Sequence, residues 1–154
     1  MEKTQIIHYQ ETTFAQLSDA DRQLMQAAID ATASAYAPYS HFHVGAALRL
    51  SDGTIVPGSN QENIAYPSGL CAERTALFAA GAHHPDKKAV ALAIVGRNPE
   101  GALVPASPCG ACRQVMAEQE NRQQSKLRVL CYHSEDKISI FDGVESLLPF
   151  SFTM

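Results

Sequence analysis

The sequence is short of cysteine, of basic residues and of long apolar runs. Four cysteines in 154 residues are too few for a disulfide scaffold. No stretch approaches the roughly 20 apolar residues of a membrane span, and Met1–Gln10 lacks the apolar core of a secretory signal. Lys and Arg number 12 against 16 Asp and Glu, and the formal net charge of -4 disfavours binding to a phosphate backbone. We therefore expect a soluble cytoplasmic protein that binds neither nucleic acid nor membrane.

The length and the apolar content favour one folded domain. A chain of this size buries roughly 68–70% of the surface that its unfolded form exposes. It needs neither disulfides nor a metal to hold a core, and we expect a single domain over residues 1–154. In a reducing compartment, cysteines that lie close together more often bind metal or take part in catalysis than form cross-links.

The spacing of apolar residues predicts strands that alternate with helices. We expect strands at residues 42–50, 54–58, 89–95, 127–132 and 138–141. We expect helices from the N-cap Ser18 to before Pro38, at 71–80 and at 112–121. Asp52-Gly53 is a hairpin signal between the first two strands, and Gly81 is expected to end the second helix. This order predicts the α/β class, with helices layered on a mixed sheet.

Three of the four cysteines stand at the beginnings of expected helices. Cys71 opens one helix, and Cys109 and Cys112 open the next. Because successive parallel strands of an α/β sheet bring such helix starts to the same edge, we expect the three thiols to meet there. Three thiolates with one open position are typical of a catalytic zinc site. Cys131, inside an apolar strand, is expected to be a buried small hydrophobe.

Two charged residues lie just beyond Cys71 in the same expected helix turn. Glu73 can lean over the open metal position and act as a base without ligating the metal. Arg74 can donate to the thiolate sulfurs and offset the negative charge of three thiolates on one divalent ion. A C-x-x-C pair alone would also suit a redox dithiol. The addition of Cys71 and Glu73 matches the zinc deaminase signature, in which an x-E segment precedes P-C-x-x-C.

The segments around these residues resemble the cytidine deaminase family in its small homotetrameric form. The resemblance rests on segments at Tyr36–Ser40, Phe42–Ala47, Asn60–Asn63, Cys71–Arg74, Pro108–Arg113 and Leu147–Pro149, with Phe152. It implies a three-layer α/β/α sandwich around a mixed five-stranded sheet. It also implies one Zn²⁺ per chain, bound by Cys71, Cys109 and Cys112.

The resemblance further implies an activity and the roles of single residues. The reaction would be hydrolytic deamination of cytidine and 2′-deoxycytidine to uridine and 2′-deoxyuridine plus ammonia, in pyrimidine salvage. Glu73 would carry protons to N3 of the base and to the leaving amine. The implied substrate contacts are Phe42, Asn60, Glu62, the backbone N–H of Ala72 and the carbonyl of Ser107. In a homotetramer with shared active sites, Tyr66 or Phe152 would reach a neighbour's site.

Three other functions stay open. The same chemistry on another aminated nucleoside, such as a blasticidin-type antibiotic, is one, although Asn60 and Glu62 favour a ribose-bearing substrate. A non-catalytic zinc-stabilised binding module is the second, and it would not need Glu73. Polynucleotide editing is disfavoured by the few basic residues. The apolar segment 147–152 is expected either to dock on its own domain or to cover a neighbouring subunit.

Overall fold

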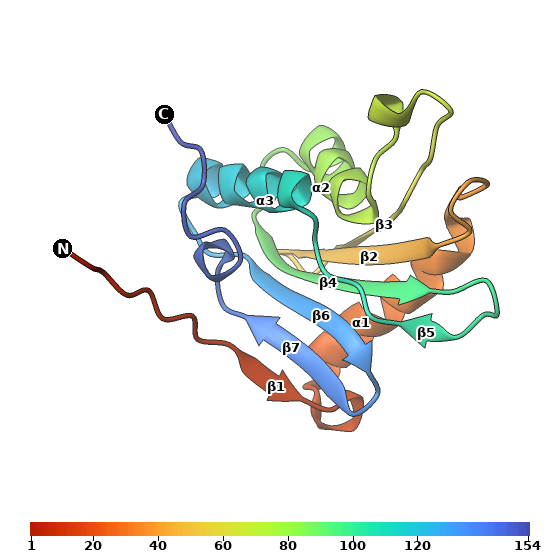
Figure 1. Cartoon of the computed structure of the whole chain (residues 1–154), viewed down its shortest axis with the longest axis horizontal. Helices are drawn as coiled ribbons and strands as arrows, with labels where there is room; N and C mark the ends of the chain where they lie inside the picture. Colours follow the sequence, from red (N-terminus) through yellow and green to blue (C-terminus); the bar gives the residue numbers. More distant parts are fainter.

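A mixed seven-stranded sheet forms the centre of the computed structural model, which describes residues 1–154 (Figure 1). The strands are β1 (Gln10–Thr12), β2 (His43–Leu50), β3 (Ile55–Ser59), β4 (Ala89–Arg97), β5 (Leu103–Val104), β6 (Arg128–Ser134) and β7 (Lys137–Phe141). Their order is β1-β7-β6-β4-β2-β3, and β5 pairs with β4. Neighbouring strands are antiparallel except β4 and β6, which run parallel.

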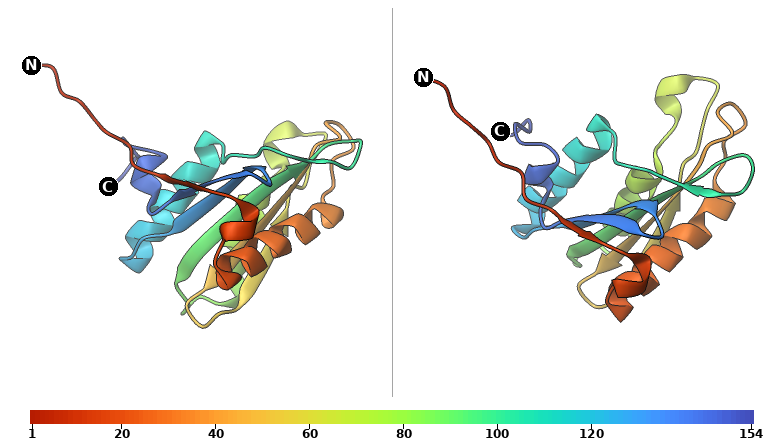
Figure 2. Two further views of the ribbon diagram at one scale, coloured as in Figure 1. Left: turned by 90° about the horizontal axis from the view of Figure 1, so that it is seen from below. Right: turned by 60° about the horizontal axis from the view of Figure 1, so that its bottom comes forward.

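Three α-helices cover the two faces of this sheet, as Figure 2 shows. The helix α1 (Asp19–Ala31) lies on one face, and α2 (Ala72–His83) and α3 (Gly110–Gln123) lie on the other. Strand β2 is buried on both faces: Leu48 packs in the core under α2 and α3, and Ala47 packs in the core under α1. The predicted three-layer α/β/α class is therefore confirmed.

Two glycines let the helices lie close to the sheet. A Cβ on Gly45 would stand 1.9 Å from the carbonyl oxygen of Ala28 in α1. A Cβ on Gly58 would stand 2.4 Å from the carbonyl oxygen of Ala72 at the start of α2. Real Cβ atoms do not approach backbone that closely, so larger residues would push both helices outward. Gly58 thereby fixes the depth at which the start of α2 sits.

The first helix begins where its cap residue predicts. Ser18 Oγ accepts a hydrogen bond from the N–H of Asp21 at 3.1 Å, which satisfies one of the free donors of the first turn. The Asp21 carboxylate is buried and pairs with Arg49 in β2 and Arg128 in β6, each at 3.1 Å. These ion pairs tie α1 to two strands of the sheet.

Several details differ from the sequence prediction. The predicted five-stranded sheet has two further strands, β1 and β5, which are only three and two residues long. Such short strands carry too little alternation to be found by periodicity. The prediction that Gly81 ends the second helix is wrong, because α2 continues to His83. A glycine lowers helix stability by about 1 kcal/mol without breaking the hydrogen-bond ladder.

The first helix is also shorter than predicted. It ends at Ala31 and is followed by a 3-10 turn at Thr32–Ser34, well before Pro38. In α3 the first helical residue is Gly110, two positions before the predicted start. None of the helices combines the length and the apolar character that crossing a membrane requires.

The topology brings the starts of α2 and α3 to one edge of the sheet (Figure 1). Strands β3 and β4 are each antiparallel to β2, which lies between them, so they point the same way. The chain enters α2 after β3 and enters α3 after β4 and β5. The two strands run in the same direction, as expected, although β2 lies between them.

Candidate active site

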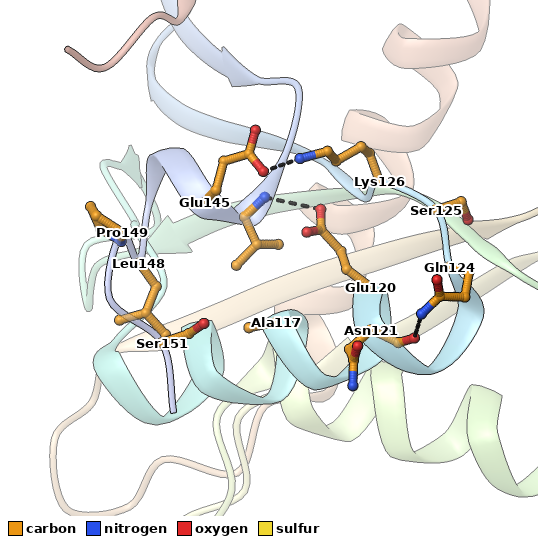
Figure 3. A pocket seen from close by; sticks show the side chains of 11 residues that line it. Ala117, Glu120, Asn121, Gln124, Ser125, Lys126, Glu145, Leu148, Pro149 and Ser151 are labelled. Carbon is orange, nitrogen blue, oxygen red and sulfur yellow. Dashed lines mark hydrogen bonds and ion pairs between the residues drawn. The ribbon is translucent and has the colours of Figure 1, made fainter. Parts of the chain in front are cut away.

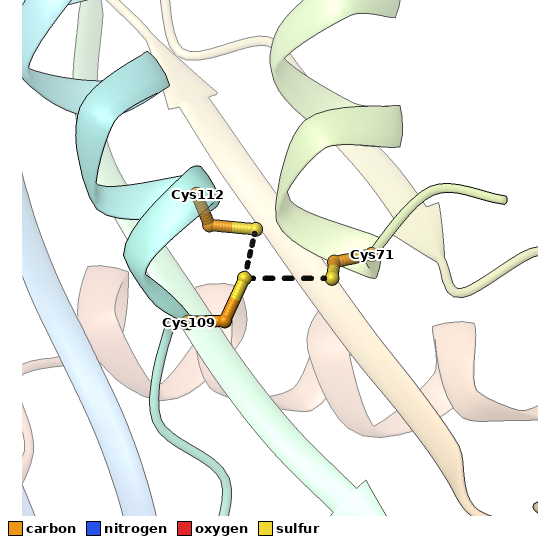
Figure 4. A group of neighbouring side chains, drawn as sticks. All are labelled: Cys71, Cys109 and Cys112. Carbon is orange, nitrogen blue, oxygen red and sulfur yellow. Dashed lines mark hydrogen bonds between the residues drawn. The ribbon is translucent and has the colours of Figure 1, made fainter. Parts of the chain in front are cut away.

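Three cysteine side chains point toward one another from the starts of α2 and α3 (Figure 4). Cys71 is the N-cap residue of α2, Cys109 is the N-cap residue of α3, and Cys112 lies in the first turn of α3. The Cys109 sulfur lies 3.8 Å from that of Cys71 and 3.5 Å from that of Cys112. All three sulfurs lie within 4.8 Å of one another, and no pair forms a disulfide.

This donor set fits a zinc ion. Zn–S bonds of about 2.3 Å at tetrahedral angles place two sulfurs roughly 3.8 Å apart, close to the distances between these thiols. Three sulfur donors leave the fourth position of a tetrahedron open. Both helices also direct the positive ends of their dipoles at the sulfurs, which favours thiolates.

Arg74 adds a positive charge to the thiol cluster. Its Nη2 donates to the sulfur of Cys71 at 3.7 Å, and this hydrogen bond raises the pKa of Arg74. The hydrogen bond from Cys112, and then that from Arg74, lower the pKa of Cys71 to about 5, although burial acts the other way. The same contact with Cys71, together with burial, raises the pKa of Cys112. Of these two thiols, Cys71 is therefore the first to ionise.

Glu73 lies in the same first turn of α2 and is only 3% exposed. Burial is the main reason that its pKa is raised to about 7, and the charge of Cys71 raises it further. A carboxyl group whose pKa lies near neutral pH suits proton transfer in both directions. Beside it, Ala72 is fully buried and its N–H belongs to the first turn, where no intrahelical acceptor exists.

A cavity of about 220 Å³ opens beside the thiol cluster. Its lining residues are Tyr39, Asn60, Gln61, Glu62, Asn63, Tyr66, Gly69, Leu70, Cys71 and Arg74. The fold thus gathers three of the residues expected to contact substrate or a neighbouring subunit, Asn60, Glu62 and Tyr66, around Cys71. They come from the segment that links β3 to α2.

The Asn60 side chain is held by the beginning of β2. Its Nδ2 donates to the carbonyl of Phe42 at 2.9 Å, and its Oδ1 accepts from the N–H of Val44 at 2.7 Å. These bonds fasten the loop after β3 to the neighbouring strand. They leave one amide hydrogen and one oxygen lone pair for a ligand.

Glu62 is held by the turn before β2. Its carboxylate accepts from the N–H groups of Tyr39 at 2.9 Å and Ser40 at 3.3 Å, and from the Ser40 hydroxyl. The Ser40 hydroxyl bond is the main reason that the pKa of Glu62 is lowered. The same hydroxyl accepts from the N–H of Phe42 at 3.1 Å. Ser40 ends one of the segments that resemble the family, but its role in holding Glu62 could not be predicted from the sequence.

Four residues expected to contact substrate or a neighbouring subunit do not line the cavity: Phe42, Ala72, Ser107 and Phe152. Phe42 is 36% exposed, and its ring packs over the backbone of Gly96, where an added Cβ would lie 2.7 Å away. Ser107 lies exposed in the loop before Cys109. Phe152 is 73% exposed in the C-terminal segment. Of the thiol cluster only Cys71 lines the cavity, where it meets the loop after β3 without these four residues.

These features define a class of protein. An α/β/α sandwich with three thiols at two neighbouring helix starts, and a buried carboxyl group beside them, is the arrangement of zinc-dependent hydrolytic deaminases. Comparison with known proteins narrows this class. The family model described as the cytidine and deoxycytidylate deaminase zinc-binding region matches residues 18–127.

Relatives with known names and structures agree with this match. A protein of Halalkalibacterium halodurans named cytidine deaminase is 50% identical over 99 residues, which are 64% of this chain and 71% of that protein. A cytidine deaminase of Mycobacterium tuberculosis is 39% identical over 103 residues, 66% of this chain and 74% of that protein. The crystal structure of cytidine deaminase from Burkholderia pseudomallei gives a TM-score of 0.73 at 39% identity, and covers 88% of this chain and 100% of that one. The chain belongs to the cytidine deaminase family.

Proposed function

We propose that this protein catalyses the zinc-dependent hydrolytic deamination of cytidine and 2′-deoxycytidine to uridine and 2′-deoxyuridine, with release of ammonia. The position of Glu73 carries the proposal. Its carboxyl group is buried beside three cysteine sulfurs that already supply the metal donors. A purely structural zinc site is closed by four protein ligands and has no use for a free carboxylate of raised pKa.

In this proposal Cys71, Cys109 and Cys112 bind one Zn²⁺ per chain. Bound zinc supplies Lewis acidity at its open position. The guanidinium of Arg74 and the starts of α2 and α3 offset the charge of the thiolates, so that less of the positive charge of the ion is neutralised.

The proton transfers belong to Glu73. As the carboxylate, it takes a proton from the attacking water and delivers it to N3 of the pyrimidine ring while oxygen adds to C4. It then takes the remaining proton from the oxygen added at C4 and carries it to the amino group, which leaves as ammonia as the C4 carbonyl forms. The pKa of about 7 lets one carboxyl group both accept and release a proton in this sequence.

Substrate recognition is assigned to backbone groups and to the cavity. The N–H of Ala72 and the carbonyl of Ser107 would hydrogen-bond the edge of the base. Asn60 and Glu62 line the cavity and would bind the ribose hydroxyls. Phe42 would pack on the base, and its carbonyl accepts a hydrogen bond from the Asn60 side chain.

We propose a homotetramer in which neighbouring subunits complete each site. The cavity of about 220 Å³ is small beside ligand pockets of roughly 300–1,000 Å³, so further walls are needed to enclose a nucleoside. Tyr66 is 91% exposed and Phe152 is 73% exposed, and both would bury aromatic surface at a neighbour's site. The metal site needs its thiols reduced, which supports a cytoplasmic location. The conversion of cytidine to uridine would give the enzyme its place in pyrimidine salvage.

Elemental analysis of the purified protein, paired with a deamination assay, tests the proposal. We expect about one zinc per chain and ammonia release from cytidine and 2′-deoxycytidine. Cytosine, dCMP, a blasticidin-type nucleoside and a single-stranded oligonucleotide serve as alternative substrates. Turnover of one of these with none on cytidine would reassign the substrate. Bound zinc without any deamination would identify a binding module.

A further inference from the structure

The residue after Cys112 links the metal loop to the C-terminal segment, which we define as residues 147–152. Arg113 Nε donates to the carbonyl of Pro108 at 2.8 Å, and Arg113 Nη1 donates to the carbonyl of Leu147 at 2.7 Å. Neither carbonyl accepts a backbone N–H. A single guanidinium therefore donates hydrogen bonds to two carbonyl oxygens. One belongs to Pro108, directly before Cys109, and the other to Leu147, the first residue of the C-terminal segment.

Gln114 holds the other end of the same segment. Its Nε2 donates to the carbonyl of Phe152 at 2.9 Å, and its Oε1 accepts from the N–H of Phe152 at 3.1 Å. Leu147 itself is buried in the core with α3, whereas Phe152 is exposed. The side chains that hold the C-terminal segment thus directly follow a cysteine of the thiol cluster.

The C-terminal segment does not rest along the whole of α3. A cavity of about 470 Å³ separates it from the second half of the helix, and its lining includes Ala117, Glu120, Leu148, Pro149 and Ser151 (Figure 3). Glu120 uses one carboxylate oxygen to bind the N–H of Val144, ahead of the segment. The hydrogen bonds of the segment to α3 are therefore those made by Arg113 and Gln114.

Cys109 is the cysteine that this link would affect. Its sulfur lies close to both of the others, at 3.8 and 3.5 Å. It caps α3 without a side-chain hydrogen bond to the helix, and the proline before it has no N–H to donate. The Pro108–Cys109 peptide is thus fixed in part by the Arg113 bond.

We propose that Arg113 is a positioning residue for the metal site, and that through it the docking of the C-terminal segment and the retention of zinc depend on each other. Arg113 holds the Pro108 carbonyl, and hence the Cys109 sulfur, while it is itself oriented by the Leu147 carbonyl. A lysine cannot reproduce the link, because a single ammonium group lacks the planar fork that reaches two acceptors at once. Coupling between two binding events is reciprocal, so bound zinc also stabilises the docked segment.

The test is the rate at which the zinc-loaded, full-length protein releases zinc to a chromophoric chelator, measured without substrate. We expect Arg113→Lys and Arg113→Gln to release zinc at least about 10-fold faster than the unmutated protein. Gln123→Ala is the matched control. Gln123 also joins α3 to backbone, through the N–H and carbonyl of Ala89, but at the far end of the helix. The Gln123→Ala substitution should lower the Tm and leave the rate of zinc release unchanged.

The effect of bound zinc on the docking of the C-terminal segment is measured by amide hydrogen exchange in residues 147–152. We expect faster exchange in both Arg113 variants and in the zinc-free protein, and no change there in Gln123→Ala. The proposal is overturned if the Arg113 variants release zinc at the unmutated rate. It is equally overturned if Gln123→Ala releases zinc as fast as they do, because general loss of stability would then be the cause.

Any effect of Arg113 on turnover rests on the proposed function, and the two ideas fail differently. A protein that deaminates no nucleoside, but loses zinc when Arg113 is replaced, would refute the function alone. Normal cytidine turnover with unchanged zinc release in the variants would refute the role of Arg113 alone.

Discussion

The guanidinium of Arg74 lies 3.7 Å from the sulfur of Cys71, one helical turn away on α2. It is a cation in direct contact with the thiol cluster, beside a helix start that already favours negative charge. A site with three thiolates around one divalent ion would be net negative without such a cation. The Arg74 guanidinium therefore offsets part of the negative charge of the metal site. Its effect on reactivity can be tested by replacing Arg74.

Arg74→Ala should lower kcat for cytidine about 10-fold or more while the fold is kept, because the metal becomes a weaker Lewis acid when the thiolate charge is not offset. The kcat of Arg74→Lys should lie between those of Arg74→Ala and the unmutated protein, since lysine keeps the positive charge but lacks the planar, forked donor group of arginine. Steady-state kinetics with circular dichroism and zinc content check this. Full activity in Arg74→Ala would exclude the role.

Glu73→Gln should reduce kcat about 1,000-fold with zinc content unchanged, because the amide cannot accept the proton of the attacking water. The matched control is Glu118→Gln, at an exposed position of α3, which should behave like the unmutated protein. Uridine formation at the normal rate in Glu73→Gln would show that the proposed proton transfers are wrong.

The raised pKa of Glu73 also predicts how stability changes with pH in the zinc-free protein. The folded carboxyl group holds its proton up to about pH 7, whereas the unfolded one releases it near its usual pKa of 4.5. Between these values the folded state binds more protons, so the free energy of unfolding falls as pH rises. Relative to Glu73→Gln, the unmutated protein should lose stability from pH 4.5 to 7 and then level off. Urea unfolding of both under reducing conditions measures this difference, and a constant difference would contradict it.

Metal binding should separate the cysteines into two groups. Cys109→Ala should lose zinc and activity, because it removes the sulfur that lies close to both of the others. Cys131→Ala should keep both, since that thiol is buried in β6 and burial raises its pKa to about 12. A chelator should lower the Tm of the unmutated protein, and added zinc should restore it. Zinc loss in Cys131→Ala beyond its loss of stability would place that residue in the metal site.

Asp21→Asn should destabilise the fold by about 3 kcal/mol at pH 7, because it leaves Arg49 and Arg128 without their shared carboxylate. Burial opposes ionisation of Asp21, but hydrogen bonds from Arg128 and Arg49 outweigh it and lower its pKa below the usual 3.8. The stabilisation is therefore present above pH 3.8 and lost as pH falls through the lowered pKa. Thermal unfolding from pH 3 to 7 measures it, with the exposed Asp19→Asn as control. Equal stability of both variants at pH 7 would show that the ion pairs of Asp21 do not stabilise the fold.

The elements that follow from local patterns were predicted well. The Ser18 cap, the alternation along β2 and the apolar run of β4 each depend on residues a few positions apart, so they can be read along the chain. The short strand β1 could not be predicted, because its pairing with β7 depends on residues more than a hundred positions away. The end of α2 was missed because a single glycine weakens a helix less than packing on the sheet stabilises it.

The groups that we propose carry the chemistry could be predicted along the chain, because thiols, a carboxyl group and a guanidinium at helix starts are recognisable from type and spacing. How these groups and their surroundings are held depends on the folded arrangement of the chain. The bonds of Asn60 to β2, of Ser40 to Glu62 and of Arg113 to Leu147 join segments that meet only after the sheet has formed. A hydrogen bond depends on the position and direction of both partners, and for distant partners these are set by the path of the folded backbone.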